Sequence, residues 1–239
     1  ALDRKTATPI IINGDMQIAQ RATSVTGITD AGYKALDRFT AYLVDNGTWT
    51  QSKDTDVPSG YGFSSSMKFD CTTADTSVAS GSLHLLRHMV EAQNCQVLKT
   101  GTSSAETLTL AFWIKSSVTG TYICEIEKHD AGRSISQAYT ISSANTWEKK
   151  VLTFPADTTG TITNDNGIGL GVHWCFGAGS NWATGTLQTS WGSMTTNARF
   201  TGQVNGASST DNNILITGVQ LEVGTFDANS IPAFQFEDA

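Results

Sequence analysis

The side chains that could carry acid–base chemistry are spread along the chain. A glycosidase needs two carboxylates several ångströms apart, and the candidates are Asp15, Asp37, Asp70, Glu91, Glu125, Glu127, Glu148 and Glu222. Glu125 and Glu127 alternate with apolar residues on one face of a predicted strand, a pattern typical of a surface that faces solvent. No Gly-x-Ser-x-Gly nucleophile motif occurs in the sequence. We therefore expect no enzymatic activity.

Metal and nucleotide motifs are also incomplete. His84 and His88 lie in a segment that alternates like a strand, which would place them about 13 Å apart, too far to share one ion. Residues 167–171, Gly-Ile-Gly-Leu-Gly, lack the last glycine of a dinucleotide loop and the lysine of a phosphate loop, so they predict a close backbone approach within a strand. The four cysteines form no Cys-x-x-Cys pair and predict buried free thiols. No cofactor and no metal are expected.

Tryptophan is the remaining residue type that could bind a ligand, because its ring stacks on sugar rings. Trp113 and Trp174 lie in predicted strands and Trp147 begins another, so we interpret these three as structural, whereas Trp49 fits either role. Trp182 and Trp191 are flanked by Gly, Ser, Asn and Thr, which offer little to bury them. Together with Asn181 they are the predicted glycan contacts, and the alternative is that both tryptophans anchor a loop.

The elements that would position these residues are short alternating segments separated by Gly, Ser, Asn, Asp and Thr. This pattern predicts an all-β jelly-roll β-sandwich of two antiparallel sheets. The predicted strands cover residues 38–44, 48–52, 67–71, 83–91, 108–115, 121–128, 134–140, 148–154, 169–176 and 213–223.

Only two segments have a helical pattern, residues 31–38 and 92–100. Residues 177–209 are dense in Gly, Ser, Thr, Asn and Ala and predict a long loop excursion from the sandwich, where binding residues often lie. We expect an N-terminal lead-in over residues 1–9 and one domain over residues 10–239.

Composition excludes several classes of function. The 239 residues carry a net charge of −7, only 15% of them are charged, and about a quarter are Ser or Thr, which favours strands and turns. Without a cluster of Lys and Arg, no nucleic-acid partner is expected. No apolar run reaches the length of about 18 residues that a membrane span requires, so no membrane insertion is expected.

Several motifs together resemble a domain common in the structural proteins of tailed bacteriophages. They are residues 13–21 (Asn-Gly-Asp-Met-Gln-Ile-Ala-Gln-Arg), residues 37–39 (Asp-Arg-Phe), residues 110–117 (Leu-Ala-Phe-Trp-Ile-Lys-Ser-Ser), residues 145–150 (Asn-Thr-Trp-Glu-Lys-Lys) and residues 216–224 (Ile-Thr-Gly-Val-Gln-Leu-Glu-Val-Gly). The motifs follow one another in the order of that family, from about residue 10 to residue 236. Residues 231–237 resemble the stretch that leads many of its members into a further segment, so the ending here suggests a trimmed polypeptide.

The resemblance implies a non-enzymatic virion protein of the tail-fibre, receptor-binding or head-appendage kind, with a domain similar to carbohydrate-binding modules. Implied partners are other phage virion proteins, a homo-oligomer such as a trimer, and a host cell-surface glycan. Assembly in the host cytoplasm fits free thiols. The alternatives are a purely structural decoration or fibre protein, a glycan-degrading spike and a cellular carbohydrate-binding module.

The same resemblance bears on calcium, which such modules often hold between the first and last strands. Asp15 and Glu222 would be its ligands, but Gln17 stands where those modules tend to offer a carboxylate. We therefore expect no metal, and expect Asp15, Asp37, Arg38 and Glu222 to form structural hydrogen bonds.

Overall fold

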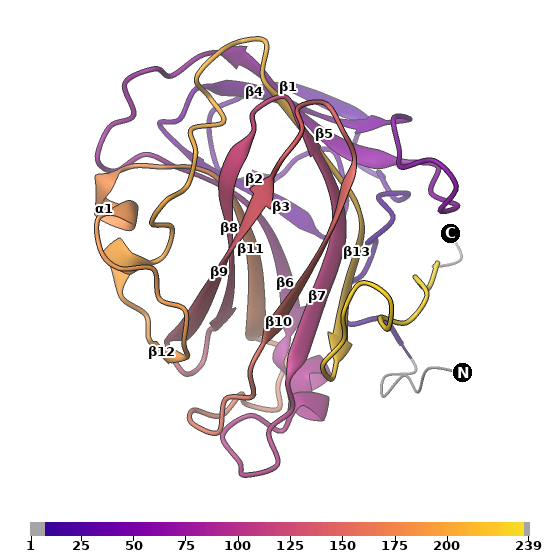
Figure 1. The fold of residues 1–239 in the computed structure, drawn as a ribbon, viewed down its shortest axis with the longest axis vertical. Coiled ribbons are helices and arrows are strands. Elements are labelled where there is room, and N and C mark those ends of the chain that lie inside the picture. The colour runs from indigo at the N-terminus through magenta and orange to yellow at the C-terminus, as the bar shows by residue number, and fades with distance from the viewer. Residues whose placement is uncertain (1–7, 237–239) are drawn as a thin grey trace.

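The computed structural model describes residues 8–236, which form two facing β-sheets (Figure 1). The strands are β1 (Ser24–Ile28), β2 (Gly32–Tyr33), β3 (Phe39–Val44), β4 (Thr48–Asp54), β5 (Ser66–Thr73), β6 (Leu83–Glu91), β7 (Leu108–Ser116), β8 (Gly120–Lys128), β9 (Arg133–Ile141), β10 (Glu148–Phe154), β11 (Ile168–Ala178), β12 (Gly192–Ser193) and β13 (Asn213–Val223). The helices are all short: η1 (Ala92–Leu98), α1 (Ser180–Ala183) and η2 (Thr196–Ala198).

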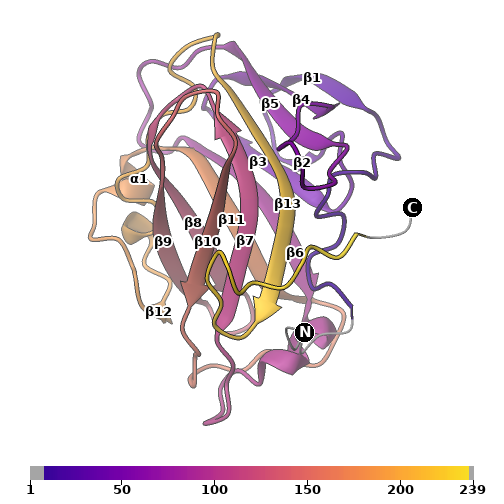
Figure 2. The same ribbon diagram turned by 45° about the vertical axis from the view of Figure 1, so that its right-hand side comes forward.

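The sheets have six and seven strands and only antiparallel pairs. The six-stranded sheet has the order β1-β4-β5-β13-β7-β10, and the seven-stranded sheet has the order β12-β9-β8-β11-β6-β3-β2. Figure 2 shows β10, β7 and β13 side by side in the first sheet. The predicted jelly-roll β-sandwich is confirmed.

The core lies between the sheets and follows from period-two alternation. In β7, the predicted inner residues Leu108, Leu110, Phe112 and Ile114 are all buried, and Phe112 packs edge-to-face on Trp174 of β11 with ring centroids 5.8 Å apart. Trp49 is also fully buried and donates its indole N–H to the carbonyl of Asn46 (2.8 Å). Trp174 is therefore structural as predicted, and the structure assigns Trp49 to the core.

One predicted helix is wrong and the other is a 3₁₀ helix. Residues 31–38 form the short strand β2 and turns instead, because Gly32 (φ 145°) and Arg38 (φ 69°) have dihedral angles that no α-helix contains. The Ala35 amide N–H donates to the Gln51 side chain (2.8 Å) rather than to a helical carbonyl. The second segment forms η1, which ends where Lys99 enters the left-handed region (φ 49°).

One glycine of the glycine-rich motif, Gly169, lies close to another backbone segment, as predicted. A Cβ atom placed on Gly169 would lie 2.5 Å from the Cα atom of Ala92, a distance that only glycine permits. All four cysteines are buried and free. Within residues 8–236, no helix has the length and apolarity needed to cross a membrane.

His84 is an unusual core residue, because burial lowers its pKa to about 3. Its imidazole lies between Trp49, Phe69 and Phe176, with ring centroids 4.7, 5.2 and 5.3 Å away. Neither ring nitrogen has a hydrogen-bond partner among the described residues. The folded protein therefore keeps this histidine neutral and unsatisfied.

We predict that His84→Leu stabilises the fold, by about 1–3 kcal/mol, because it removes two buried nitrogens without partners. The gain should be larger at pH 5 than at pH 8. Wild-type His84 takes up a proton below pH 6.5 only in the unfolded chain, so wild-type stability falls as the pH drops through this value. Thermal unfolding at both pH values tests this. The control His129→Leu alters an exposed side chain and should change stability little. An equal gain at both pH values would contradict the prediction.

Candidate functional site

Residues 177–209 leave β11, lie against the seven-stranded sheet and carry α1, β12 and η2 (Figure 1, orange). Backbone hydrogen bonds hold this segment to three strands. The Ser136 N–H in β9 donates to the Gln188 carbonyl (2.7 Å), the Val204 N–H donates to the Thr121 carbonyl in β8 (3.0 Å), and the Gly206 N–H donates to the Phe176 carbonyl in β11 (2.8 Å). The predicted loop excursion is thus an ordered layer, which we call the covering segment.

Under the covering segment lies a second hydrophobic cluster, separate from the core. Leu85 of β6, Ile123 of β8 and Cys175 of β11 project from the outer face of the sheet, and the covering segment packs Phe200, which is fully buried, against them. Trp182 and Leu187 pack on the same cluster and are partly buried. Burial of these side chains explains why outward-facing strand positions are apolar here.

A charged network lies beside this cluster. Glu125 of β8 is directly across from His173 of β11, which is across from Arg87 of β6. Arg199 of the covering segment binds the Glu125 carboxylate with Nε (2.9 and 3.1 Å) and with a terminal nitrogen (2.5 Å). The Nδ1–H of His173 donates to the same carboxylate (3.0 Å). Three charged or polar groups of distant sequence segments therefore meet in one network.

The expectation that Glu125 faces solvent is wrong, because the covering segment buries its side chain completely. Burial raises the pKa of Glu125, but the hydrogen bonds from His173 and Arg199 and the charge of Arg199 outweigh it and lower this pKa to about 2. Burial likewise opposes the charge of Arg199, and Glu125 raises the Arg199 pKa above its ordinary value. Both groups are thus charged at neutral pH.

The network contains three side chains that could bind a metal ion, but the Arg199 guanidinium already lies among them. Glu125, Glu127 and His173 place ligand atoms within 4.8 Å of one another. The Arg199 terminal nitrogen lies 2.5 Å from Glu125, 3.7 Å from Glu127 and 3.4 Å from His173 Nδ1, where it supplies the positive charge that two carboxylates require. These residues do not fit a metal as well, so we assign the network a structural role.

The network also does not fit the carboxylate pair of a glycosidase. Such a pair needs one carboxyl group that gives up a proton and a second that contacts the sugar. Glu125 is ionised and its side chain is fully buried, so it can do neither. Glu125 is therefore not a member of such a pair.

Arg199→Ala should lower the free energy of unfolding by about 3–5 kcal/mol, because it leaves the buried Glu125 carboxylate without its cation. Arg21→Ala is a matched control: Arg21 also pairs with a carboxylate, that of Asp37, but its side chain is 54% exposed, so its loss should cost less than about 1 kcal/mol. Urea unfolding at pH 7 measures both. Similar losses for the two variants would contradict a structural role for the network.

Glu125→Gln should change the pH dependence of stability. The Glu125 pKa is about 2 in the folded protein against 4.5 ordinarily. Its charge therefore stabilises the fold above pH 4.5, and this contribution disappears as the pH falls toward 2. The difference in unfolding free energy between wild type and Glu125→Gln should narrow from pH 5 to pH 3. A difference that stays constant over this range would show that Glu125 is not held ionised.

A groove of about 400 Å³ opens in the covering segment. Trp191 lines it, and its indole N–H donates to the Pro155 carbonyl (2.7 Å), which fixes the ring. The other polar lining residues are uncharged: Thr186, Gln188, Ser190, Ser193, Thr195 and Asn197. We call this the Trp191 groove.

The structure separates the three predicted glycan contacts. Of these, only Trp191 lines the Trp191 groove. Trp182 of α1 packs on the second hydrophobic cluster and donates its indole N–H to the Gly81 carbonyl (3.2 Å), so it anchors the covering segment. Asn181 is exposed, with its backbone N–H bound to the Ser80 carbonyl (2.9 Å). Contact of Trp182 or Asn181 with a glycan stays a prediction.

Arg199 and His173 are the residues of this region that sequence reasoning missed. Arg199 is the only charged residue between positions 177 and 209, and a single charge in an uncharged segment is a signal that could have marked it. Its partner Glu125 is far away in the sequence, so no spacing pattern connects the two.

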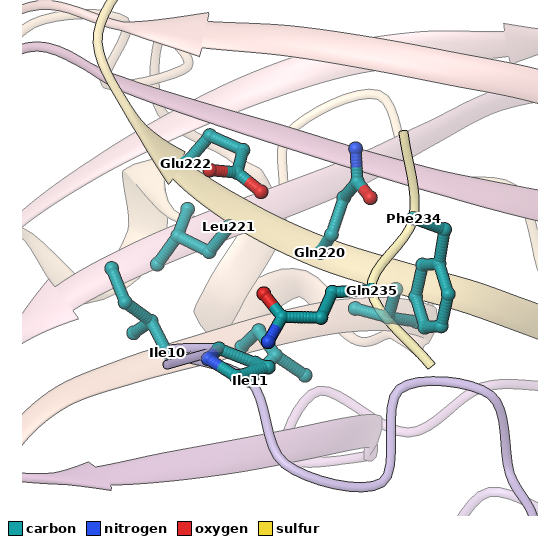
Figure 3. Close-up of a pocket in the computed structure, with 9 residues that line it drawn as sticks. Ile10, Ile11, Gln220, Leu221, Glu222, Phe234 and Gln235 are labelled. Atoms are coloured by element: carbon teal, nitrogen blue, oxygen red, sulfur yellow. The ribbon is translucent and has the colours of Figure 1, made fainter. Parts of the chain in front are cut away.

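Glu222, one of the two residues considered as calcium ligands, lines a small cavity beside β13 (Figure 3), and Asp15 is not among the residues that line it. Ile10 and Ile11 are buried beside β13, and the cavity between them, Glu222 and Gln235 has a volume of only about 10 Å³, room for one water molecule at most. Residues 1–7 of the predicted lead-in lie outside the described part of the chain.

Four residues were expected to form structural hydrogen bonds, and the structure shows such bonds for some of them. Asp37 accepts the Gln20 N–H (2.7 Å), and Arg38 binds both oxygens of Glu91 (2.9 and 3.0 Å), as predicted. Burial raises the pKa of Asp15, although hydrogen bonds from the backbone of Gln17 and of Asp15 itself oppose this shift. Glu222 lines the small cavity of Figure 3.

Comparisons with known proteins give matches in structure only. No protein-family model and no curated protein sequence matches this chain. Among solved structures, it is similar to the enzymatically active domain of tailspike protein 4 of bacteriophage CBA120 (15% identity, TM-score 0.46), covering 90% of this chain and 21% of that one. This chain therefore spans about a fifth of the tailspike chain that it matches.

Two further structures are similar over nearly their whole length. One is a putative sugar binding protein from Bacteroides thetaiotaomicron (11% identity, TM-score 0.44, 90% of this chain and 100% of that one). The other is the N-terminal cellulose-binding domain of β-1,4-glucanase C from Cellulomonas fimi (14% identity, TM-score 0.41, 92% and 99%). These neighbours are carbohydrate-binding modules and a phage tailspike domain, and the likeness concerns the arrangement of strands.

Proposed function

We propose that this protein is a non-enzymatic module of a phage virion that binds a neutral glycan of the host surface in the Trp191 groove. The observation that carries the binding function is the chemistry of that groove. Its indole ring is fixed by the Pro155 carbonyl and by the buried Lys128 ammonium, which lies 5.1 Å from the ring centroid and pairs with Asp157, and the other polar groups that line the groove are uncharged hydroxyls and amides. A sugar ring has apolar C–H faces and a rim of hydroxyl groups. An aromatic ring and uncharged hydrogen-bonding side chains match both features.

The groove is shallow and open, so each site should bind weakly. Repetition of the site on an oligomeric appendage would strengthen attachment, because each further contact is intramolecular. The virion setting, with other phage proteins and a homo-oligomer as partners, is supported by the motif resemblance along residues 10–236. Burial of Glu125 removes one of the candidate catalytic carboxylates.

Trp191→Ala should weaken binding to host glycan about five- to tenfold, because an aromatic contact of this kind contributes about 1 to 1.4 kcal/mol. Trp191→Phe keeps a ring and should retain most binding. Tyr33→Ala is the matched control, since Tyr33 is an aromatic side chain that is 48% exposed and lies outside the groove. Glycan arrays and adsorption of the protein to host cells measure binding, and thermal unfolding shows whether each variant is folded.

If folded Trp191→Ala adsorbs like wild type, the groove is not the glycan site. If neither wild type nor any variant binds host glycans or cells, the adhesion function itself is wrong, and a purely structural decoration or fibre protein replaces it.

A further inference from the structure

A second groove lies on the opposite side of the molecule, on the outer face of the six-stranded sheet. After β13 the chain turns back and crosses over β7 and β13 (Figure 2). Between this C-terminal segment and residues 60–63 is a groove of about 330 Å³, within the size range of ligand pockets. Ala111 and Trp113 of β7 and Gln220 of β13 line it from the sheet. We call it the Tyr61 groove, after the exposed ring at its edge.

Its aromatic side chains form two groups. Tyr61 and Trp113 lie with ring centroids 4.4 Å apart and planes inclined by 49°, and Tyr61 is 54% exposed. Phe63, Phe234 and Phe236 pack on one another with centroids 5.0 to 5.4 Å apart. Exposed aromatic faces at a concave surface are unusual for residues with only a structural role. Trp113, which the sequence placed with the structural residues, is half-buried and shares this surface.

Hydrogen bonds within the protein hold the walls of the groove in place, so the groove is preformed. The Gln220 side chain donates to the Pro232 carbonyl (3.1 Å) and so holds the C-terminal segment on β13. Thr217 donates its hydroxyl to the Ser65 carbonyl (2.7 Å) and holds the other wall. Gly218 of β13 allows the Phe63 ring to approach this strand closely, because a Cβ atom on Gly218 would lie 2.6 Å from that ring. A preformed site loses less conformational entropy on binding.

Charge distinguishes this groove from the Trp191 groove. Lys149 of β10 lines it and is exposed, and no ion pair of Lys149 occurs within residues 8–236. The nearby carboxylate of Asp56 is neutralised by Lys115 (2.5 Å) and accepts the Trp147 indole N–H (2.8 Å). An aromatic surface beside an uncompensated ammonium group fits a ring that carries a carboxylate.

We infer that the Tyr61 groove binds an acidic sugar, with the ring of a uronic acid on Tyr61 and Trp113 and its carboxylate at Lys149. This site is independent of the proposed Trp191 site and lies on the other sheet. The protein would then hold two glycan sites of different charge preference, one for neutral and one for acidic sugars.

The probes are α-1,4-linked trigalacturonic acid and its neutral counterpart galactotriose, which differ in the carboxylates alone. We expect the acid, added to the isotope-labelled full chain, to shift NMR signals of β7 and of residues 60–63, including the Trp113 indole N–H, and leave residues 185–198 unchanged. Galactotriose should bind this groove more weakly. Binding of the acid should weaken as salt is added, because the Lys149 contact is exposed.

Four variants decide the assignment. Tyr61→Ala should weaken binding of the acid about tenfold, and Ala111→Leu should block the groove by filling its floor. Lys149→Gln should cost up to about fivefold for the acid and nothing for galactotriose. Trp191→Ala should leave binding of the acid unchanged, because Trp191 lies outside the Tyr61 groove. The acidic-sugar proposal and the proposed function at the Trp191 groove can therefore fail independently, and the two failures are distinguishable. Equal binding of both sugars, no shifts at all, or acid binding that survives Tyr61→Ala and Ala111→Leu would overturn the proposal.

Discussion

The buried ion pair between Glu125 and Arg199 is the constraint on which the functional surface depends. A carboxylate without solvent contact is costly unless a cation and hydrogen bonds compensate it, and here Arg199 and His173 do so. Arg199 reaches β8 only because the covering segment folds back over the sheet. The same segment carries Trp191, so the network that compensates one buried charge also places the ring of the proposed neutral-glycan site.

The two sheets cover apolar side chains on their outer faces with different segments of the chain. The seven-stranded sheet covers Leu85, Ile123 and Cys175 with the long segment between β11 and β13. The six-stranded sheet is covered in part by the C-terminal segment, which packs Phe234 on Phe63. Each cover is incomplete, and each leaves a groove at its edge. One groove is lined by uncharged polar groups and the other has Lys149 beside aromatic rings, which is the basis for assigning them different sugars.

Local patterns predicted the scaffold well, and they selected one residue that lines a groove. Alternation in residues 108–115 placed Leu110 and Phe112 in the core, because the period of two follows directly from strand geometry. Trp191 was selected because its sequence neighbours could not bury it, yet it is partly buried against the core and also lines a groove. The helix predicted for residues 31–38 failed because the backbone there follows its tertiary contacts, among them the bond from Ala35 to Gln51. The Tyr61 groove was not predicted, since its lining residues come from five separated segments.

The sequence by itself determined the class of fold, the inner faces of the main strands and the low-charge composition of the segment from 177 to 209, because these are properties of neighbouring residues. Only the tertiary structure decided that Glu125 is buried, that Trp182 and Trp191 both hold the covering segment to the fold while Trp191 also lines a groove, and that Trp113 meets Tyr61. Each of these depends on which face of a strand a distant segment covers. Alternation separates the two faces of a strand, but contacts across the fold set which of them meets solvent.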